Sequence, residues 1–354
     1  MNQEINQEVR EKVREKSELL PDFAVDCLFS IEAAKSPKTL YEYTKDWLLF
    51  FDYLVDMKKV TAPSSKYITV EDLEKVNERD LLSFFDRLTK YVRKFETASG
   101  KPTEQTFKNG PQGKARKLAS IRTLYQYLIR RKFLSIDPSV YVEFKIPSKS
   151  KIRNRLSPNE IQSYFQAILG DVELTKAEQK FHGKVVERDY IISLFLAYMG
   201  LRVSELAALD ISDVTINQQD DQSHIIVTRK GGDEQSIAMP EQIIGDVEGF
   251  IEVRKSMKDI PKSENALFLS LQKKRMNSRT IRQMIEKYRM RAGIQKTVTP
   301  HVFRRTFGTK HYNDYGDMYL TARVLGHSSA ETTRKHYADP DESRERKSMT
   351  GFKY

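Results

Sequence analysis

The feature that most constrains the fold of this chain is a short polar stretch near its middle, KIPSKSKIRNR at residues 145–155. It holds Pro, Ser and five cations but no acidic residue, a composition typical of an exposed linker. The whole chain has 354 residues, which is long enough for two hydrophobic cores. We therefore predict two domains, residues 1–147 and residues 153–354, joined by a cationic linker.

Apolar spacing predicts that the first domain is helical. In TLYEYTKDWLLFFDYLVDMKK, which follows Ser36-Pro37, the apolar residues recur at the period of an amphipathic helix. A polar stretch from about Ser99 to Gly113 is predicted to be a loop. We expect these helices in order: a charged segment within residues 1–35, the helix after Ser36-Pro37, a helix from Thr69, a helix over RDLLSFFDRLTKYVRKF, and a helix from about Lys114 to Lys132.

The second domain is predicted to be rich in helices, with one small pair of strands. Ser157-Pro158-Asn159-Glu160 supplies an N-cap residue, a Pro at the first helical turn and a Glu at the capping-box position. Two β-prone runs flank Gly231-Gly232 in HIIVTRKGGDEQSIAM, which favours a hairpin. The order predicted is helix, helix, strand pair and then several helices.

Charge and cysteine content narrow the class of protein. Lys and Arg outnumber Asp and Glu by 60 to 49, for a net charge of +11, which favours a polyanionic partner such as nucleic acid. The alternative is a basic protein without such a partner. The single cysteine, Cys27, excludes an internal disulfide and a cysteine-based zinc site, and its apolar neighbours suggest a core position.

We expect a cytoplasmic protein without a membrane segment. The N-terminus, MNQEINQEVREKVREK, is too charged for a signal peptide, and the longest apolar run, Ile191 to Leu201, is too short to span a bilayer.

A basic helix is the predicted contact with a phosphate backbone. No acidic residue occurs between Glu104 and Asp137, whereas cations are interleaved there with apolar residues at helical spacing. The alternative is a solvated basic face. The candidate DNA-contacting residues, including two from the linker, are Lys114, Arg116, Lys117, Arg122, Lys149 and Lys151.

Four motifs of the second domain carry groups suited to phosphodiester chemistry. Breaking that bond without a metal needs a nucleophile, cations around the developing charge, and an acid for the leaving oxygen. In YMGLRVSEL, Arg202 follows a Gly and has Glu205 three residues on to orient its guanidinium. Lys230 lies at the hairpin turn, within reach of a leaving oxygen. Taken singly, the first motif is explained by an ordinary surface ion pair between Arg202 and Glu205. The second is explained by ordinary turn chemistry around Lys230.

The other two motifs supply histidines, a second arginine and a tyrosine. In TPHVFRRTF, His301 and Arg304 share one helix face, whereas Arg305 points about 100° away. In VLGHSSAETTRKHYAD, His327 follows a Gly and Tyr337 follows a short helix. Taken singly, the His-Arg pair is structural and Tyr337 is one of 17 tyrosines.

In the order Arg, Lys, His-x-x-Arg, Gly-His, Tyr, these motifs resemble the tyrosine recombinase family, the phage-integrase-like enzymes that break and rejoin DNA. The resemblance spans about residues 153–345. It implies that Arg202 and Arg304 clamp the scissile phosphate and that His301 and His327 hydrogen-bond to it. It also implies that Lys230 is the acid for the 5′-hydroxyl leaving group. Tyr337 is the implied nucleophile, which forms a 3′-phosphotyrosine bond.

The resemblance also implies the fold and the branch of the family. The fold is mainly α: an all-helical, SAM-like core-binding domain and an α-rich catalytic domain with a small antiparallel sheet. Within the family the chain resembles the Xer branch, especially the single-recombinase streptococcal type, on pieces such as VTRKGG, NALFLSL and VTPHVFRRTF. Two departures stand out. Arg305 replaces a His found in many members, and the ten residues from His327 to Tyr337 exceed the interval of many Xer enzymes.

The partners implied are a double-stranded DNA recombination site, a homotetramer on two duplexes with C-terminal tail exchange, and a septal DNA translocase. Neither metal nor ATP is expected, and the sequence has no GxxxxGK[ST] or GxGxxG pattern. The leading hypothesis is resolution of chromosome dimers. A mobile-element integrase with the same chemistry, a DNA-binding protein without catalysis and a metal nuclease are the alternatives. The sequence does not specify the DNA target.

Overall fold

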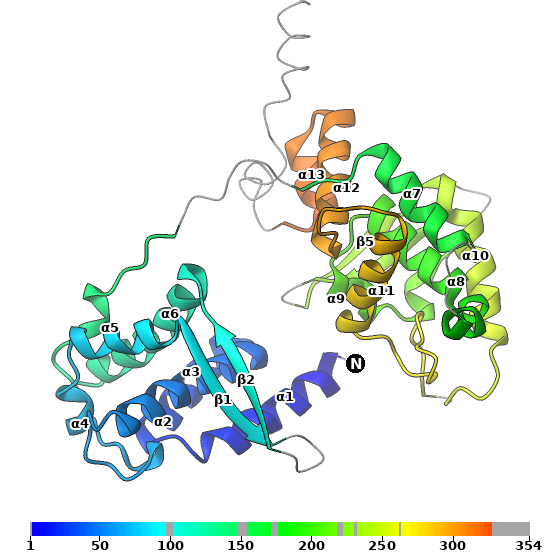
Figure 1. Ribbon diagram of the computed structural model, residues 1–354. Helices are drawn as coiled ribbons and strands as arrows, with labels where there is room; N and C mark the ends of the chain where they lie inside the picture. Colours follow the sequence, from blue (N-terminus) through cyan, green and yellow to red (C-terminus); the bar gives the residue numbers. More distant parts are fainter. Residues whose placement is uncertain are drawn as a thin grey trace, which may run out of the picture. The chain divides into compact units, whose positions relative to one another are not determined.

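The computed structural model describes residues 2–96, 102–146, 154–170, 176–217, 222–229, 232–261 and 263–327. The chain divides into two compact units, Met1–Ser150 and Lys151–Tyr354 (Figure 1). The buried apolar side chains form two separate clusters, one within each unit.

The first unit is mainly helical. Its α-helices are α1 (Asn2–Ser17), α2 (Asp22–Ile31), α3 (Pro37–Asp56), α4 (Val70–Glu74), α5 (Glu78–Arg87) and α6 (Pro111–Arg130). Short 3-10 turns connect them: η1 (Glu32–Ala34), η2 (Ser65–Tyr67) and η3 (Pro138–Tyr141).

Helix α3 begins and packs as its sequence predicts. The Ser36 hydroxyl accepts a hydrogen bond from the Thr39 N–H at 3.3 Å, and Pro37 occupies the first turn, where an N–H has no helical partner. The indole N–H of Trp47 donates to the carbonyl of Ser120 in α6 at 2.9 Å, which joins the two longest helices of the unit. The large side chains that α3 buries include Leu40, Trp47, Phe50, Phe51 and Leu54.

A two-stranded antiparallel sheet, which the sequence did not predict, lies between α5 and α6. Strand β1 (Lys90–Glu96) pairs with β2 (Pro102–Lys108), with Lys90 opposite Lys108. The expectation of a helix through residue 95 and of a loop over residues 99–113 was therefore wrong. Helix α5 ends at Arg87, and the rings of Tyr91 and Phe107 then stack across the strands, 5.4 Å between centroids. Such cross-strand aromatic pairs favour a sheet over a continued helix.

The second unit is a helical domain around a small antiparallel sheet, so the predicted fold class is confirmed. The sheet has the order β3-β4-β5. Its elements are α7 (Pro158–Leu169), α8 (Lys176–Tyr198), α9 (Val203–Ala208), η4 (Ile211–Asp213), β3 (Val214–Thr215), β4 (His224–Thr228), β5 (Glu234–Ala238), α10 (Glu241–Ser256), α11 (Ser278–Arg291), α12 (Pro300–Tyr315) and α13 (Met318–Leu325).

The aromatic core of this unit positions α12. Tyr164 of α7 is fully buried and meets Phe303 of α12 edge to face, with 5.1 Å between ring centroids, and Tyr288 of α11 at 6.2 Å. Edge-to-face pairs of this kind add to the free energy of burying the rings. Helix α7 starts as predicted, because Ser157 and Glu160 form the capping box.

The hairpin of β4 and β5 also matches the prediction. Its last pair is Thr228 opposite Glu234, and the Arg229 N–H donates to the carbonyl of Asp233 at 2.7 Å, which continues the pairing one residue beyond the strands. Among the described helices, none is long and apolar enough to cross a membrane.

We expect Ser36→Ala to destabilise the first unit alone, by about 0.5–2 kcal/mol, because it removes the N-cap of α3. Trp47 is the only tryptophan of the chain, so its fluorescence during urea unfolding reports on the core that contains α3. Ser157→Ala is the matched control, since it removes the N-cap of α7 in the other unit. A Trp47 transition that shifts equally in both variants would contradict two independent cores.

Candidate active site

Arg202 is positioned by a sharp turn between α8 and α9. Gly200 has φ +61, and a Cβ there would lie 2.3 Å from a ring carbon of Phe307 in α12, so only glycine fits this close approach. Arg202 then precedes α9. Its backbone N–H donates to Glu205 Oε2 at 2.8 Å and its Nη1 to Oε1 at 2.7 Å, which orients the guanidinium as predicted.

Glu205 is the buried carboxylate around which three arginines gather. Arg229 Nη1 lies 2.9 Å from Oε2, as an ion pair without hydrogen-bond angles, and Arg304 Nη1 lies 3.9 Å from Oε2. Burial alone raises the pKa of Glu205, but the hydrogen bonds from Arg202 and the charge of Arg229 outweigh it and hold this pKa below its usual range. Three cations and one carboxylate leave an excess of two positive charges, which suits a phosphate whose charge grows during reaction.

Arg304 reaches this cluster from α12. Its side chain is only 4% exposed, and its Nη1 donates to the carbonyl of Gly200 at 2.7 Å, while Nη2 donates to the carbonyl of Leu325. His301 lies one turn earlier on α12, as the His-x-x-Arg spacing predicts. Arg305 points elsewhere and contacts the carbonyl of Asn154 at 3.4 Å.

The C-terminal end of α13 is held by four side chains of this region. The last four carbonyls of a helix have no partner within it, and they carry the negative end of its dipole. Here four successive carbonyls each accept a side-chain N–H. The donors are Gln235 Nε2 to Arg323 at 2.9 Å, Arg229 Nη2 to Val324 at 2.9 Å, Arg304 Nη2 to Leu325, and Arg202 Nη2 to Gly326 at 2.8 Å.

This capped helix end places His327 beside the arginines. Gly326 has φ +61 and turns the chain out of α13, and the His327 N–H donates back to the carbonyl of Ala322 at 2.9 Å. The structure therefore brings Arg202, His301 and Arg304 of the predicted site together, and it places the backbone of His327 directly after the Gly326 carbonyl that Arg202 binds. Lys230 and Tyr337 lie outside the described residues.

Arg229 is the member of the cluster that the sequence prediction missed. Strand β4 alternates, with Ile225 and Val227 buried, so the next inward position of the same face is residue 229. That alternation is the sequence signal that identifies Arg229, because a cation on the buried face of a strand requires a partner.

His301 is exposed on α12, yet its neighbours partly desolvate its ring. This desolvation, together with the charges of Arg304, Arg282 and other arginines, lowers the pKa of His301 below its usual value of 6.5. A lowered pKa favours the neutral imidazole, which has one donor and one acceptor nitrogen.

The predicted DNA-contacting residues of α6 have partners within the first unit. Arg116 and Lys117 share the carboxylate of Asp46, which is 2% exposed. The Arg116 Nη1 and Nη2 donate to Oδ2 and Oδ1 at 2.8 and 2.9 Å, and the Lys117 Nζ donates to Oδ1 at 2.9 Å. The side chain of Arg116 is nevertheless 45% exposed, whereas that of Lys117 is 12% exposed.

The remaining candidates of this group differ in accessibility. Lys114 Nζ donates to Thr89 Oγ1 at 2.8 Å, and Arg122 donates to the carbonyls of Ser139 and Val142, so Arg122 holds η3 against α6. Lys149 and Lys151 lie outside the described residues. Contact of this set with DNA stays a prediction.

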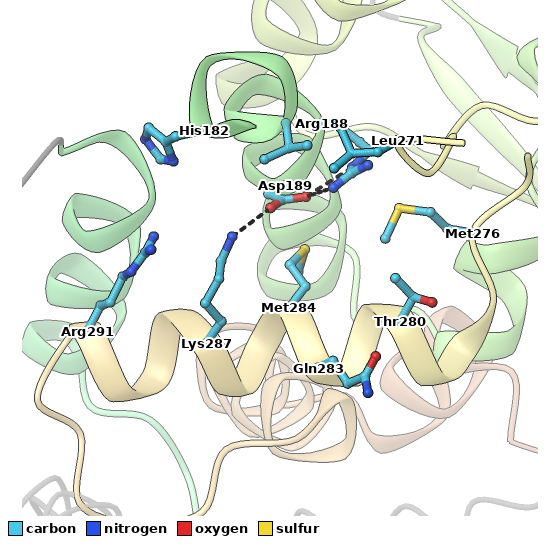
Figure 2. A pocket seen from close by; sticks show the side chains of 11 residues that line it. His182, Arg188, Asp189, Leu271, Met276, Thr280, Gln283, Met284, Lys287 and Arg291 are labelled. Atoms are coloured by element: carbon cyan, nitrogen blue, oxygen red, sulfur yellow. Dashed lines mark hydrogen bonds and ion pairs between the residues drawn. The ribbon is translucent and has the colours of Figure 1, made fainter. Parts of the chain in front are cut away.

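A second charged cluster lines a cavity of about 470 Å³ between α8 and α11 (Figure 2). Its centre is Asp189, which accepts hydrogen bonds from Arg188 at 2.6 Å and from Lys287 at 3.4 Å. Burial lowers the pKa of Lys287 against the attraction of Asp189. None of the four motifs contributes a side chain to this cavity, so it is separate from the predicted site. Among the described residues, no three His, Cys, Asp or Glu side chains form a metal-binding group.

We expect Gly326→Ala to lower the free energy of unfolding by more than the backbone strain of a left-handed residue. The reason is that the added Cβ would lie 2.4 Å from Arg229 Nε. Gly293→Ala is the matched control, since Gly293 has φ +67 and nothing within 4 Å of its Cβ position. The strain alone is worth about 1–2 kcal/mol. Equal losses in the free energy of unfolding for the two variants would show that Arg229 does not fill the space beside Gly326.

The titration of His301 is a second check on this geometry. We expect NMR of labelled histidine to give a pKa below 6.5, with the charged form appearing only as the pH falls through that lowered value. Arg282→Gln in α11 should raise this pKa, because it removes a nearby positive charge. Arg279→Gln, one turn earlier on the same helix, is the control and should leave it unchanged. An unshifted value in Arg282→Gln would rule out the charge of Arg282 as a cause of the lowered pKa.

Comparison with known proteins agrees with this geometry. The phage integrase family matches residues 154–344. Tyrosine recombinase XerC of Caldanaerobacter subterraneus subsp. tengcongensis is 28% identical over 337 residues, which cover 91% of this chain and 83% of that protein. Tyrosine recombinase XerS of Streptococcus mutans is 29% identical over 336 residues, which cover 89% and 91%.

A solved structure shares the fold. XerH site-specific recombinase, in a pre-cleavage complex with its difH substrate, superposes with a TM-score of 0.62 at 17% identity, covering 98% of this chain and 95% of that one. The resemblance derived from the four motifs, including that to Xer enzymes, is confirmed. The chain therefore belongs to the phage integrase family and is a site-specific tyrosine recombinase, an enzyme that breaks and rejoins DNA.

Proposed function

We propose that this recombinase cuts one DNA strand through Tyr337 and that the group of Arg202, Arg304, His301 and His327 binds the scissile phosphate. The observation that carries the proposal is the cluster around Glu205, in which three arginines share one buried carboxylate and leave two positive charges in excess. In a site of low dielectric, fixed charges of this kind stabilise a transition state strongly, because they need no reorganisation during the reaction.

The two phosphate-binding arginines differ in their access to a ligand. The Arg202 side chain is 30% exposed, so DNA can reach its guanidinium directly. The Arg304 side chain is 4% exposed, so it contributes its positive charge from a buried position. A planar guanidinium can bind two phosphate oxygens at once, which suits Arg202 to a direct clamp.

The chemical step moves one phosphoryl bond. The Tyr337 oxygen attacks the phosphorus, the bond from phosphorus to the 5′ oxygen breaks, and a 3′-phosphotyrosine forms. The phenolic proton passes to a neutral imidazole, for which His301 is suited by its lowered pKa. Lys230 gives its proton to the leaving 5′ oxygen. Attack by a 5′-hydroxyl reverses these transfers and joins the strands without ATP, because the covalent bond conserves the energy.

Neither a metal nor a nucleotide is required in this scheme. The arginines supply the positive charge that a metal ion supplies in other phosphoryl-transfer enzymes, and Lys230 supplies the proton. Covalent-adduct formation should therefore persist in EDTA.

The proposed biological role is resolution of chromosome dimers, as suggested by similarity to Xer recombinases. That role implies action in the cytoplasm, a homotetramer on two duplexes, and cooperation with a septal DNA translocase. The alternative is integration or excision of a mobile element, which the long interval from His327 to Tyr337 favours. Sequencing of DNA trapped on Tyr337 separates the two, because a single chromosomal site supports the first and element ends support the second. A non-catalytic DNA-binding protein would trap no DNA at all.

The first unit is proposed as the core-binding domain, which closes on DNA with the catalytic domain. Lys114 and Arg116 of α6 are its more accessible cations, and the linker residues Lys149 and Lys151 extend the basic tract. Lys117 and Arg122, whose charges are engaged within the unit, contribute mainly through the electrostatic field. The segment after Tyr337, with Met349 and Phe352 as apolar anchors, is proposed to dock on a neighbouring subunit.

The direct test of the nucleophile is a nicked suicide DNA substrate, from which the cleaved strand diffuses away. We expect wild-type protein to form a covalent adduct that survives denaturing electrophoresis and that forms equally in EDTA. Tyr337→Phe should bind the same DNA and form no adduct, because it lacks the attacking oxygen. Tyr319→Phe is the control and should react as wild type. An adduct in Tyr337→Phe would exclude this residue as the nucleophile.

A further inference from the structure

None of the four motifs assigns a role to Arg229, the residue before Lys230, yet it is among the most constrained cations of the second unit. It follows β4 directly, and its side chain is 9% exposed. Desolvating a guanidinium to this extent is costly unless its N–H groups find partners. Its partners therefore indicate what the residue does.

These partners lie on three different elements. Arg229 Nη2 donates to the Val324 carbonyl of α13 at 2.9 Å, and Nε donates to Gln235 Oε1 on β5 at 2.9 Å. Nη1 forms the ion pair with Glu205 of α9. Gln235 in turn donates its Nε2 to the Arg323 carbonyl at 2.9 Å. Both strands of the hairpin are thus fastened to the C-terminal end of α13.

Each end of this connection lies close in sequence to a residue of the proposed chemistry. Lys230 is the residue after Arg229, and His327 is the third residue after Val324. Gly326 leaves the space beside the Arg229 guanidinium open, since a Cβ there would lie 2.4 Å from Nε. Because Lys230 is the next residue in the chain, loss of the Arg229 contacts is expected to affect the proton donor of the proposed function.

We propose that Arg229 is a positioning residue: by fastening the β4–β5 hairpin to the end of α13, it supports the proton transfer that the proposed function assigns to Lys230. The inference rests on the proposed function, in which Lys230 donates the proton to the 5′ oxygen as the phosphorus–oxygen bond breaks. Misplacing a proton donor by about 1 Å can cost on the order of 100-fold in rate.

A competing explanation is that Arg229 acts through Glu205 on Arg202. In that case its loss weakens the phosphate clamp rather than the delivery of the proton. The two explanations separate when the bridging 5′ oxygen of the scissile phosphate is replaced by sulfur. A thiolate is a far weaker base than an alkoxide and leaves without a proton, so a defect in the acid disappears on that substrate while a defect in the clamp remains.

The informative variant is Arg229→Lys, which keeps the charge beside Glu205 and removes the planar fork. The rate of a single covalent cleavage is measured on suicide substrates with bridging oxygen and with bridging sulfur. We expect a loss of roughly 10- to 100-fold on the oxygen substrate and the wild-type rate on the sulfur substrate. Gln235→Leu should show the same pattern more weakly, and it serves as the second variant if Arg229→Lys fails to fold.

Arg254→Lys is the matched structural control. Arg254 is also a buried arginine that caps backbone carbonyls, donating Nε to Ala266 at 2.9 Å and Nη2 to Glu264 at 3.1 Å. The Arg254→Lys variant should lower stability by the same kind of loss, but the hydrogen bonds that Arg254 donates reach neither the hairpin nor α13. Its ratio of oxygen to sulfur cleavage rates should equal that of wild type.

Lys230→Ala separates a failure of the inference from a failure of the proposed function. If wild type forms no Tyr337 adduct, or if Lys230→Ala is slow on both substrates, the assigned chemistry is wrong and the inference falls with it. The other outcome is that Lys230→Ala regains the wild-type cleavage rate on the sulfur substrate. If Arg229→Lys then cleaves slowly on both substrates, or at the wild-type rate on both, only the proposed role of Arg229 is overturned.

Discussion

The buried carboxylate of Glu205 is the interaction on which the rest of the second unit depends. Three guanidinium groups do not approach one another in a protein interior without a counter-charge, because each loses hydration there and repels the others. Glu205 offsets part of that cost for Arg202, Arg229 and Arg304 together. It does so incompletely, and the remaining positive charge is what a phosphate can use. The residue that holds the three arginines together therefore also sets how strongly the site attracts its substrate.

Much of this site could be predicted from sequence because its spacings are local. His301 and Arg304 share a face of α12 through helical periodicity, and Glu205 reaches Arg202 across a single turn. The β4–β5 hairpin followed from two β-prone runs around a pair of glycines. In each case the geometry is fixed by residues a few positions apart, so no long-range packing needs to be known.

Interactions between distant segments escaped prediction. The four carbonyls at the end of α13 are capped by side chains from three other parts of the chain, and nothing near residues 323–326 in the sequence indicates those donors. The β1–β2 sheet was missed because its strands are polar and one face is open to solvent, so the hydrophobic alternation that marks a half-buried strand is weak. For the cations of α6, the charge pattern predicted nucleic acid as the class of partner. It could not predict that Arg116 pairs with Asp46, which lies 70 residues away in the sequence.

The capped end of α13 has a consequence for which anions the site admits. Arg202 and Arg304 already donate to peptide carbonyls at the negative end of a helix dipole, so part of their positive charge is offset before any ligand binds. A chloride or a free phosphate ion gains only one local charge interaction at the site. A DNA duplex gains the same interaction and also releases the counterions condensed along its length. The helix end thus lowers the attraction of the site for every anion, and DNA can offset that loss through counterion release, whereas a small anion cannot.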